Sequence, residues 1–217
     1  MFESKAGVLL VGGLGFFLFA FISNAIVPIF MYRDLPEQPV SALANANLMY
    51  HFEDLNRRYP DAFREAFGEP TPEHCAEALN LGRSIYIGEG CWHCHSQFVR
   101  PVSNESRRWG PVAKTEEYQN ALQRPVMFGT RRVGPDLSRE GGRHANDWHM
   151  VHFFQPSTVS SGSPMPDYPW LFDGDPSKPA KRALALVTYV QWLGSWLESY
   201  PYYENYQTQE QLEEAMP

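Results

Sequence analysis

Residues 91–95 read Cys-Trp-His-Cys-His, with two cysteines three positions apart and a histidine directly after the second. This C-x-x-C-H spacing lets the thiols of Cys91 and Cys94 bond the two vinyl groups of one haem. The imidazole of His95 then lies under the iron as an axial ligand. The motif therefore predicts one covalently bound haem c.

Two other chemistries use a C-x-x-C pair. A thioredoxin-like redox pair is typical of a βαβ context, which the flanking residues lack. A zinc site would need a second pair of ligands at short spacing, and the third cysteine, Cys75, stands alone. Haem attachment is the interpretation that the flanking sequence favours.

A sixth iron ligand is expected downstream, and Met165 in the run Ser-Pro-Met-Pro (163–166) is our candidate. The flanking prolines stiffen the loop, and a thioether raises the reduction potential relative to a second histidine. A helix is predicted over Asn146–Phe154, where a packing role is expected for the methionine. The competing ligands are Met127, Met150, His144, His149 and His152.

Residues 134–137 read Gly-Pro-Asp-Leu. We expect the carbonyl of Pro135 to accept a hydrogen bond from the His95 imidazole, which would fix its tautomer; an ordinary proline turn is the alternative. Because buried carboxylates need charged or hydrogen-bonding partners, some arginines are candidate partners of the haem propionates. They are Arg100, Arg131, Arg132 and Arg143, although each could equally be a surface arginine.

An apolar stretch near the N-terminus carries no charge from Ala6 to Tyr32. A helix of that length rises about 40 Å, which exceeds a hydrocarbon core of about 30 Å. We predict an uncleaved transmembrane anchor over residues 1–33. The alternative is a cleaved signal peptide, because residues 23–25 (Ser-Asn-Ala) are small enough for a peptidase site.

The direction of this anchor is poorly set by its flanking charges, because Lys5 and Arg33 each have an acid nearby. Covalent haem attachment takes place outside the bacterial cytoplasmic membrane. We therefore expect a single-pass protein of that membrane with its haem domain on the periplasmic side.

An all-α fold is predicted, in which one N-terminal transmembrane helix precedes a cytochrome c domain with long irregular loops around haem. Residues 103–177 show little periodicity, which is unusual in a compact domain unless a large buried cofactor organises the chain. The predicted segments are a linker and extra helical segment (34–72), the haem domain (73–200) and a polar acidic tail (201–217).

Within these segments hydrophobic periodicity predicts three further helices. The first covers Ser41–Phe67 and is interrupted at Pro60, the second covers Glu73–Gly88, and the third, Lys178–Tyr200, closes the domain.

The net charge of −7 argues against a nucleic-acid partner, which would require clustered lysines and arginines. An acidic surface could receive a basic redox partner, or could simply keep the domain soluble.

Several runs together resemble the mono-haem cytochrome subunit (subunit II) of cbb3-type cytochrome c oxidases, over roughly residues 81–171. The runs are residues 90–101 (GCWHCHSQFVRP), 129–137 (GTRRVGPDL), 141–143 (GGR), 147–149 (DWH) and 165–170 (MPDYPW).

The resemblance implies a subunit of an oxidoreductase complex that relays electrons and has no substrate site of its own. Its donor would be a further c-type cytochrome subunit or a soluble cytochrome, and its acceptor the catalytic heme-copper subunit. The resemblance also implies His95 and Met165 as the axial pair. It places the anchor in the lipid bilayer against the catalytic subunit, with the Thr130 loop near that subunit's haem propionates.

The chain departs from the family in two places, where residues 41–71 look inserted and the segment after Trp170 looks shortened. Two other functions remain open at this point. One is the cytochrome c subunit of a nitric oxide reductase, which the substrate of the attached catalytic subunit would distinguish. The other is a stand-alone anchored haem c carrier or sensor, which should purify alone.

Overall fold

The computed structural model describes residues 5–197, and within them all regular structure is helical, with no strand. This confirms the predicted all-α class. The chain divides between residues 37 and 38 into two units, which are described separately below. The predicted acidic tail (201–217) lies outside the described residues.

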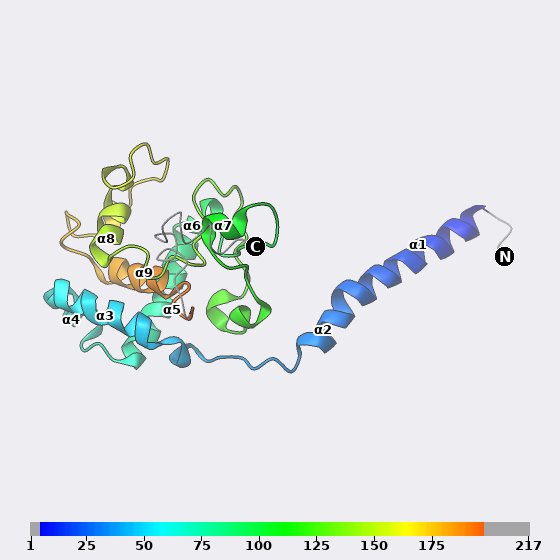
Figure 1. Ribbon diagram of the computed structural model, residues 1–217, viewed down its shortest axis with the longest axis horizontal. Helices are drawn as coiled ribbons and strands as arrows, with labels where there is room; N and C mark the ends of the chain where they lie inside the picture. The colour runs from blue at the N-terminus through cyan, green and yellow to red at the C-terminus, as the bar shows by residue number, and fades with distance from the viewer. Residues whose placement is uncertain (1–4, 198–217) are drawn as a thin grey trace, which may run out of the picture. The chain divides into compact units, whose positions relative to one another are not determined.

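Nine α-helices are found in the described part of the chain, and Figure 1 labels them. Their bounds are α1 Lys5–Phe21, α2 Val27–Tyr32, α3 Ala46–Arg58, α4 Pro60–Phe67, α5 Pro72–Gly88, α6 Cys91–Cys94, α7 Glu105–Trp109, α8 Asn146–Phe154 and α9 Lys181–Trp192. Short 3-10 turns cover Val40–Leu43, Thr115–Tyr118, Ala121–Gln123, Pro156–Thr158 and Pro169–Leu171.

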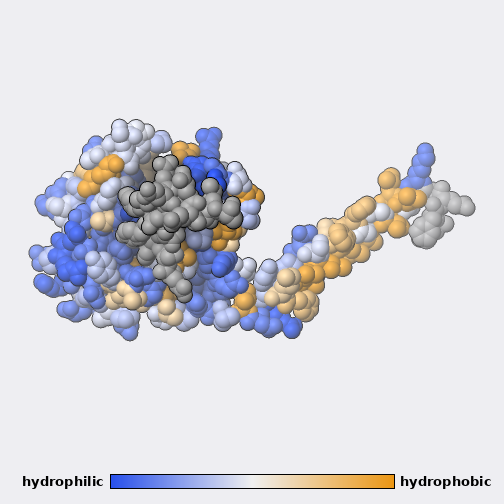
Figure 2. All heavy atoms as spheres, in the orientation of Figure 1, coloured by the Kyte–Doolittle hydropathy of each residue, from blue (hydrophilic) through white to orange (hydrophobic). Residues whose placement is uncertain are grey.

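The N-terminal unit is one continuous helical stretch, Lys5–Tyr32, with a mean hydropathy of 2.2 in its most apolar window. Its length and composition are sufficient to cross a membrane. Figure 2 shows hydrophobic residues covering most of its surface, with hydrophilic residues at its ends.

A π-helical turn, Ile22–Ile26, joins α1 to α2, and the amide of Val27 donates to the carbonyl of Ile22 five residues back. The cause is Pro28, which has no N–H to donate and crowds the preceding turn. Ser23 Oγ and Asn24 Nδ2 donate to main-chain carbonyls of the preceding turn, at 2.8 and 2.9 Å. The helix is therefore widened at this point instead of broken.

The extra helical segment forms α3 and α4, and the predicted interruption at Pro60 is confirmed because α4 begins there. The predicted start at Ser41 is too early. The 3-10 turn Val40–Leu43 precedes the helix, and Asn45 caps α3 by accepting a hydrogen bond from the amide of Leu48 at 2.9 Å.

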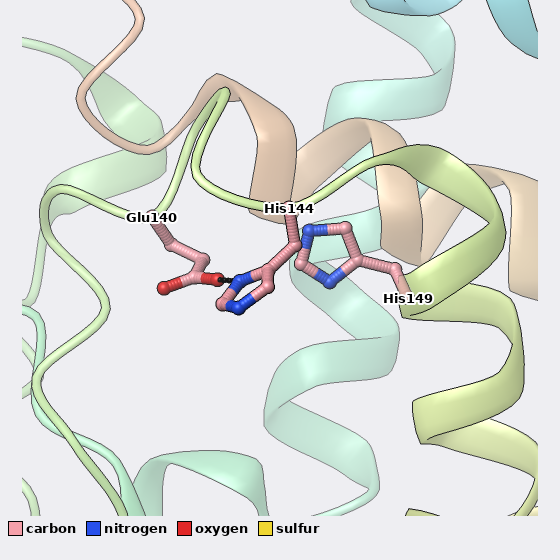
Figure 3. A group of neighbouring side chains, drawn as sticks. All are labelled: Glu140, His144 and His149. Carbon is pink, nitrogen blue, oxygen red and sulfur yellow. Dashed lines mark hydrogen bonds and ion pairs between the residues drawn. The ribbon is translucent and has the colours of Figure 1, made fainter. Parts of the chain in front are cut away.

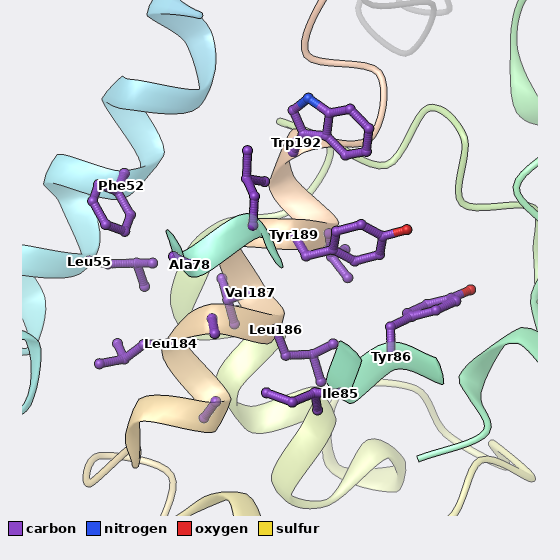
Figure 4. Packing of buried hydrophobic residues seen from close by; sticks show 14 of the residues in the cluster. Phe52, Leu55, Ala78, Ile85, Tyr86, Leu184, Leu186, Val187, Tyr189 and Trp192 are labelled. Atoms are coloured by element: carbon purple, nitrogen blue, oxygen red, sulfur yellow. The ribbon is translucent and has the colours of Figure 1, made fainter. Parts of the chain in front are cut away.

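The centre of the second unit is the pair α5 and α9, which cross one another in close contact (Figure 1). A Cβ atom on Gly82 of α5 would lie 2.1 Å from the carbonyl oxygen of Ala185 and 2.6 Å from the Cβ of Tyr189. Only glycine permits so close an approach. Figure 4 shows the surrounding core, which includes Phe52, Leu55, Ala78, Ile85, Tyr86, Leu184, Leu186, Val187, Tyr189 and Trp192.

The closing helix is shorter than predicted at both ends. Lys178 lies in a turn, where its amide donates to the carbonyl of Asp175 at 3.0 Å. It is not helical because it precedes Pro179, and the residue before a proline disfavours helical geometry. At the other end α9 stops at Trp192, and Gly194 adopts a left-handed φ of +87°. Residues 198–200 of the prediction lie outside the described part.

The irregular region contains α7, α8 and four of the 3-10 turns. The bounds predicted for α8, Asn146–Phe154, are confirmed. The loop between α7 and α8 lies beside the C-x-x-C-H motif and is described next.

Candidate haem site

The two cysteines of the motif lie on the single helical turn α6, and both thiols are free. Gly90 precedes the turn with a left-handed φ of +73°, which separates α6 from the end of α5 at Gly88. His95 ends the turn in an extended conformation, so its side chain leaves the turn directly after Cys94.

The imidazole of His95 is held by the loop of residues 129–137, here called the proline loop: Nδ1 lies 2.9 Å from the carbonyl oxygen of Pro135, to which it can donate. This hydrogen bond places the proton on Nδ1 and leaves the lone pair of Nε2 available. Burial lowers the pKa of His95, while the hydrogen bond to Pro135 opposes that shift. A Cβ on Gly134 would lie 2.2 Å from the His95 ring, so glycine makes room for it.

Main-chain hydrogen bonds fasten the loop of residues 129–137 to the motif. The amide of Gly134 donates to the carbonyl of Cys94 at 3.0 Å, and Leu137 donates to Ser96 at 2.8 Å. The amides of Thr130 and Arg131 both donate to the carbonyl of His93 at 3.0 Å. The loop and the motif therefore form one rigid assembly.

A buried ionic cluster supports the same loop. Arg132 donates to Glu105 from two nitrogens, at 2.5 and 3.1 Å, and contacts Asp136 at 3.4 Å. Asp136 also accepts hydrogen bonds from Ser96 Oγ at 2.5 Å and from the amide of Phe98 at 2.9 Å. These contacts fix the residues that follow His95 against those that follow Pro135.

Replacing Glu105 by glutamine is expected to destabilise the domain at neutral pH. Burial alone would raise the pKa of this carboxyl, but hydrogen bonds from Arg132 and Arg100 outweigh it and lower the pKa to about 2. A carboxyl with a lowered pKa contributes stability above its ordinary value of 4.5, and loses it as the pH falls toward 2. Breaking such a buried pair costs roughly 3 kcal/mol.

Denaturant unfolding at pH 7 and at pH 3 measures this difference. We expect a large deficit for Glu105→Gln at pH 7 that shrinks at pH 3, and none for Glu116→Gln, a matched change at an exposed site. An equal deficit at both pH values would contradict the ionic role of Glu105.

The four candidate arginines lie in different environments. Arg100 pairs with Glu105 at 2.7 Å, and Arg132 belongs to the same cluster. Arg131 is exposed, and Arg143 lies 3.7 Å from a carboxylate oxygen of Glu140. Two of these arginines converge on Glu105, which the sequence did not indicate, because Glu105 begins the short helix α7 in a region without hydrophobic periodicity.

The candidate methionines differ in burial. Met127 and Met150 both lie within the hydrophobic core, Met150 with no exposed surface. Met165 is half-buried at the edge of this core, and its amide donates to Ser163 Oγ at 3.2 Å. Of these three, Met165 is the one whose side chain is not enclosed by the core.

The Cys91 thiol lacks the lowered pKa of a reactive redox cysteine. Burial raises the pKa of the Cys91 thiol to about 12, whereas a reactive thiol needs a lowered pKa. Burial likewise raises the pKa of Cys75 to about 12, and this side chain lies in the core. Within residues 5–197 no cysteine belongs to a group of three potential metal ligands.

The residues present fit a haem, because two free thiols on one turn precede an imidazole whose Nδ1 is engaged and whose Nε2 is not. A helical domain built around this motif has the features of a single-haem cytochrome domain.

Residues 74–180 match the family model described as cytochrome c oxidase, mono-heme subunit/FixO. The chain belongs to this family, which confirms the resemblance over residues 81–171 and extends it in both directions. It is therefore a subunit of an oxidoreductase complex, and the family name supports one haem. Among curated proteins, none matches the chain.

Proposed function

We propose that this chain is a membrane-anchored cytochrome that relays electrons to the catalytic subunit of a cbb3-type oxidase through one covalently attached haem. The observation that carries the proposal is the hydrogen bond between His95 Nδ1 and the Pro135 carbonyl at 2.9 Å. This hydrogen bond leaves Nε2 of His95 available to bind iron, and His95 directly follows a turn with two free thiols.

Each residue of the site has one task in this proposal. Cys91 and Cys94 would attach the haem, His95 would bind the iron through Nε2, and Met165 would supply a thioether as the second protein ligand. When bound, the haem iron accepts and donates one electron. Arg131 and Arg143 remain candidates for the propionates, while Arg100 shares the carboxylate of Glu105 with Arg132.

The rigidity of the loop suits electron transfer, which is favoured when the surroundings rearrange little between oxidation states. The loop is held by main-chain hydrogen bonds to His93, Cys94 and Ser96 and by the buried cluster around Glu105. These contacts would keep the His95 ring in place in both oxidation states.

The same loop is our candidate for contact with the catalytic subunit. Val133 within the loop and Phe128 directly before it have exposed fractions of 55 and 60%. Between them Thr130 lies beside the motif, with its hydroxyl 3.0 Å from His93 Nδ1. A partner that covers Phe128 and Val133 would thus lie close to the haem-binding turn.

The remaining parts of the proposal concern the complex. The helical stretch Lys5–Tyr32 anchors the chain in the bacterial cytoplasmic membrane, and the haem domain faces the periplasm, where haem is attached. A further c-type cytochrome subunit or a soluble cytochrome is the donor. Oxygen is reduced by the catalytic subunit, and this chain has no substrate site of its own.

Replacing both Cys91 and Cys94 by alanine is expected to abolish covalent haem attachment, because no other bond would then survive denaturation. Haem staining of the denatured full-length chain measures this. Cys75→Ala is the matched control, because its thiol is enclosed in the core, and it should retain haem. If acid acetone extracted the haem from the wild-type chain, the proposal of covalent attachment would be wrong.

The complex purified from membranes tests the acceptor. Oxygen consumption that is lost in the double cysteine variant supports the oxidase relay. Consumption of nitric oxide without that of oxygen would instead favour the reductase alternative.

A further inference from the structure

A group of three potential metal ligands lies outside the proposed haem ligands, at the start of α8. A carboxylate oxygen of Glu140 and one ring nitrogen each of His144 and His149 all lie within 4.8 Å of one another. Figure 3 shows the two imidazoles side by side with the carboxylate directed at the nearer one. Glu140 and His149 are buried, and His144 is half-buried.

The three side chains come from fixed parts of the backbone. Gln191 of α9 donates from Nε2 to the carbonyl of His144 at 2.9 Å, and its Oε1 accepts from the amide of Gly142 at 2.9 Å. The ring of His144 stacks on Trp148 with centroids 3.8 Å apart and planes at 16°. His149 lies on α8, so the group is held before any ion arrives.

One ring nitrogen of His149 lacks a partner. Nε2 of His149 is buried and has no hydrogen-bonding partner among the described residues, whereas buried polar atoms are normally satisfied. Burial, followed by the nearby His144, His152 and His51, holds the pKa of His149 well below its ordinary value. A buried ring nitrogen without a partner is available to bind a metal ion.

The carboxylate of Glu140 adds the negative charge that a cation needs. One oxygen bonds His144 Nδ1 at 2.6 Å, and the other faces the guanidinium of Arg143 at 3.7 Å. Two imidazoles and one carboxylate are a ligand set typical of zinc, with a fourth position left for water.

We propose that Glu140, His144 and His149 form a zinc-binding site at the start of α8. None of these three residues belongs to the motif at residues 91–95, although Glu140 lies close enough to His95 for its charge to act on that imidazole. The exposed part of His144 gives the ion access from solvent, since 30% of that side chain is accessible.

The test uses the full-length, haem-loaded chain in detergent, stripped with a chelator and titrated calorimetrically with zinc chloride. We expect one zinc ion per chain, with two imidazoles and a carboxylate in the zinc-edge X-ray absorption spectrum. His144→Phe should weaken affinity at least about 10-fold while keeping a ring against Trp148. Glu140→Gln, which preserves shape, should do the same, and His74→Phe in α5 is the matched control.

The outcomes separate this site from the proposed haem function. If the haem-loaded chain bound no stoichiometric zinc, the proposed zinc site would be wrong. This result is expected if a haem carboxylate binds His149 instead. Zinc affinity unchanged in both His144→Phe and Glu140→Gln would also overturn it. Zinc bound by a chain that carries no haem would support the site and contradict the proposed function instead.

Discussion

Replacing Gly82 by alanine is expected to destabilise the haem domain by about 3 kcal/mol or more. The added Cβ would lie 2.1 Å from the carbonyl oxygen of Ala185 and 2.8 Å from its carbonyl carbon. These are backbone atoms of α9, which cannot move aside as the end of a flexible side chain can. Relief therefore requires α5 and α9 to separate, and the core between them to open.

Denaturant unfolding of the full-length chain, followed by circular dichroism, measures this loss. Gly88→Ala is a matched control in the same helix, because a Cβ there would meet no atom within 4 Å. It should leave stability unchanged or raise it by up to about 1 kcal/mol, since alanine favours helices. Equal stability of the two variants would contradict the close crossing of α5 and α9.

The contrast between α5 and α9 shows what sequence periodicity can and cannot predict. Both helices were expected, because their apolar residues recur at helical spacing. Their contact at Gly82 was not, because a glycine inside a helical pattern looks the same whether it faces solvent or another backbone. The end of α9 was also misplaced, since apolar spacing continues through Leu193 and Leu197 although the helix stops at Trp192.

The candidate site divides in a similar way. The C-x-x-C-H motif is local, so spacing alone indicates its chemistry, and the role of the Pro135 carbonyl follows from what an axial histidine needs. Contacts between residues far apart in the sequence have no comparable local pattern. The pairing of Arg132 with Glu105, 27 residues apart, and the convergence of His149 with Glu140 depend on how irregular loops fold.

Replacing Gly134 by alanine is expected to displace His95 while leaving the haem attached. The new Cβ would lie 2.2 Å from Cε1 and 2.6 Å from Nδ1 of the His95 ring, which is rigid and must move as a whole. The hydrogen bond from Nδ1 to Pro135 would be lost with that movement. A clash of this kind costs about 2 kcal/mol or more, which shifts the ratio of bound to displaced imidazole by more than roughly 10-fold.

Optical and magnetic circular dichroism spectra distinguish a low-spin iron with two axial ligands from a high-spin iron that has lost one. For Gly134→Ala we expect the low-spin signal to fall while haem staining of the denatured chain stays constant, because Cys91 and Cys94 are untouched. Val133→Ala is the neighbouring control: this side chain is 55% exposed, so the spectrum should not change. If Gly134→Ala also kept the full low-spin spectrum, the imidazole that the proline loop positions would not be an iron ligand. A histidine other than His95 would then have to bind the iron.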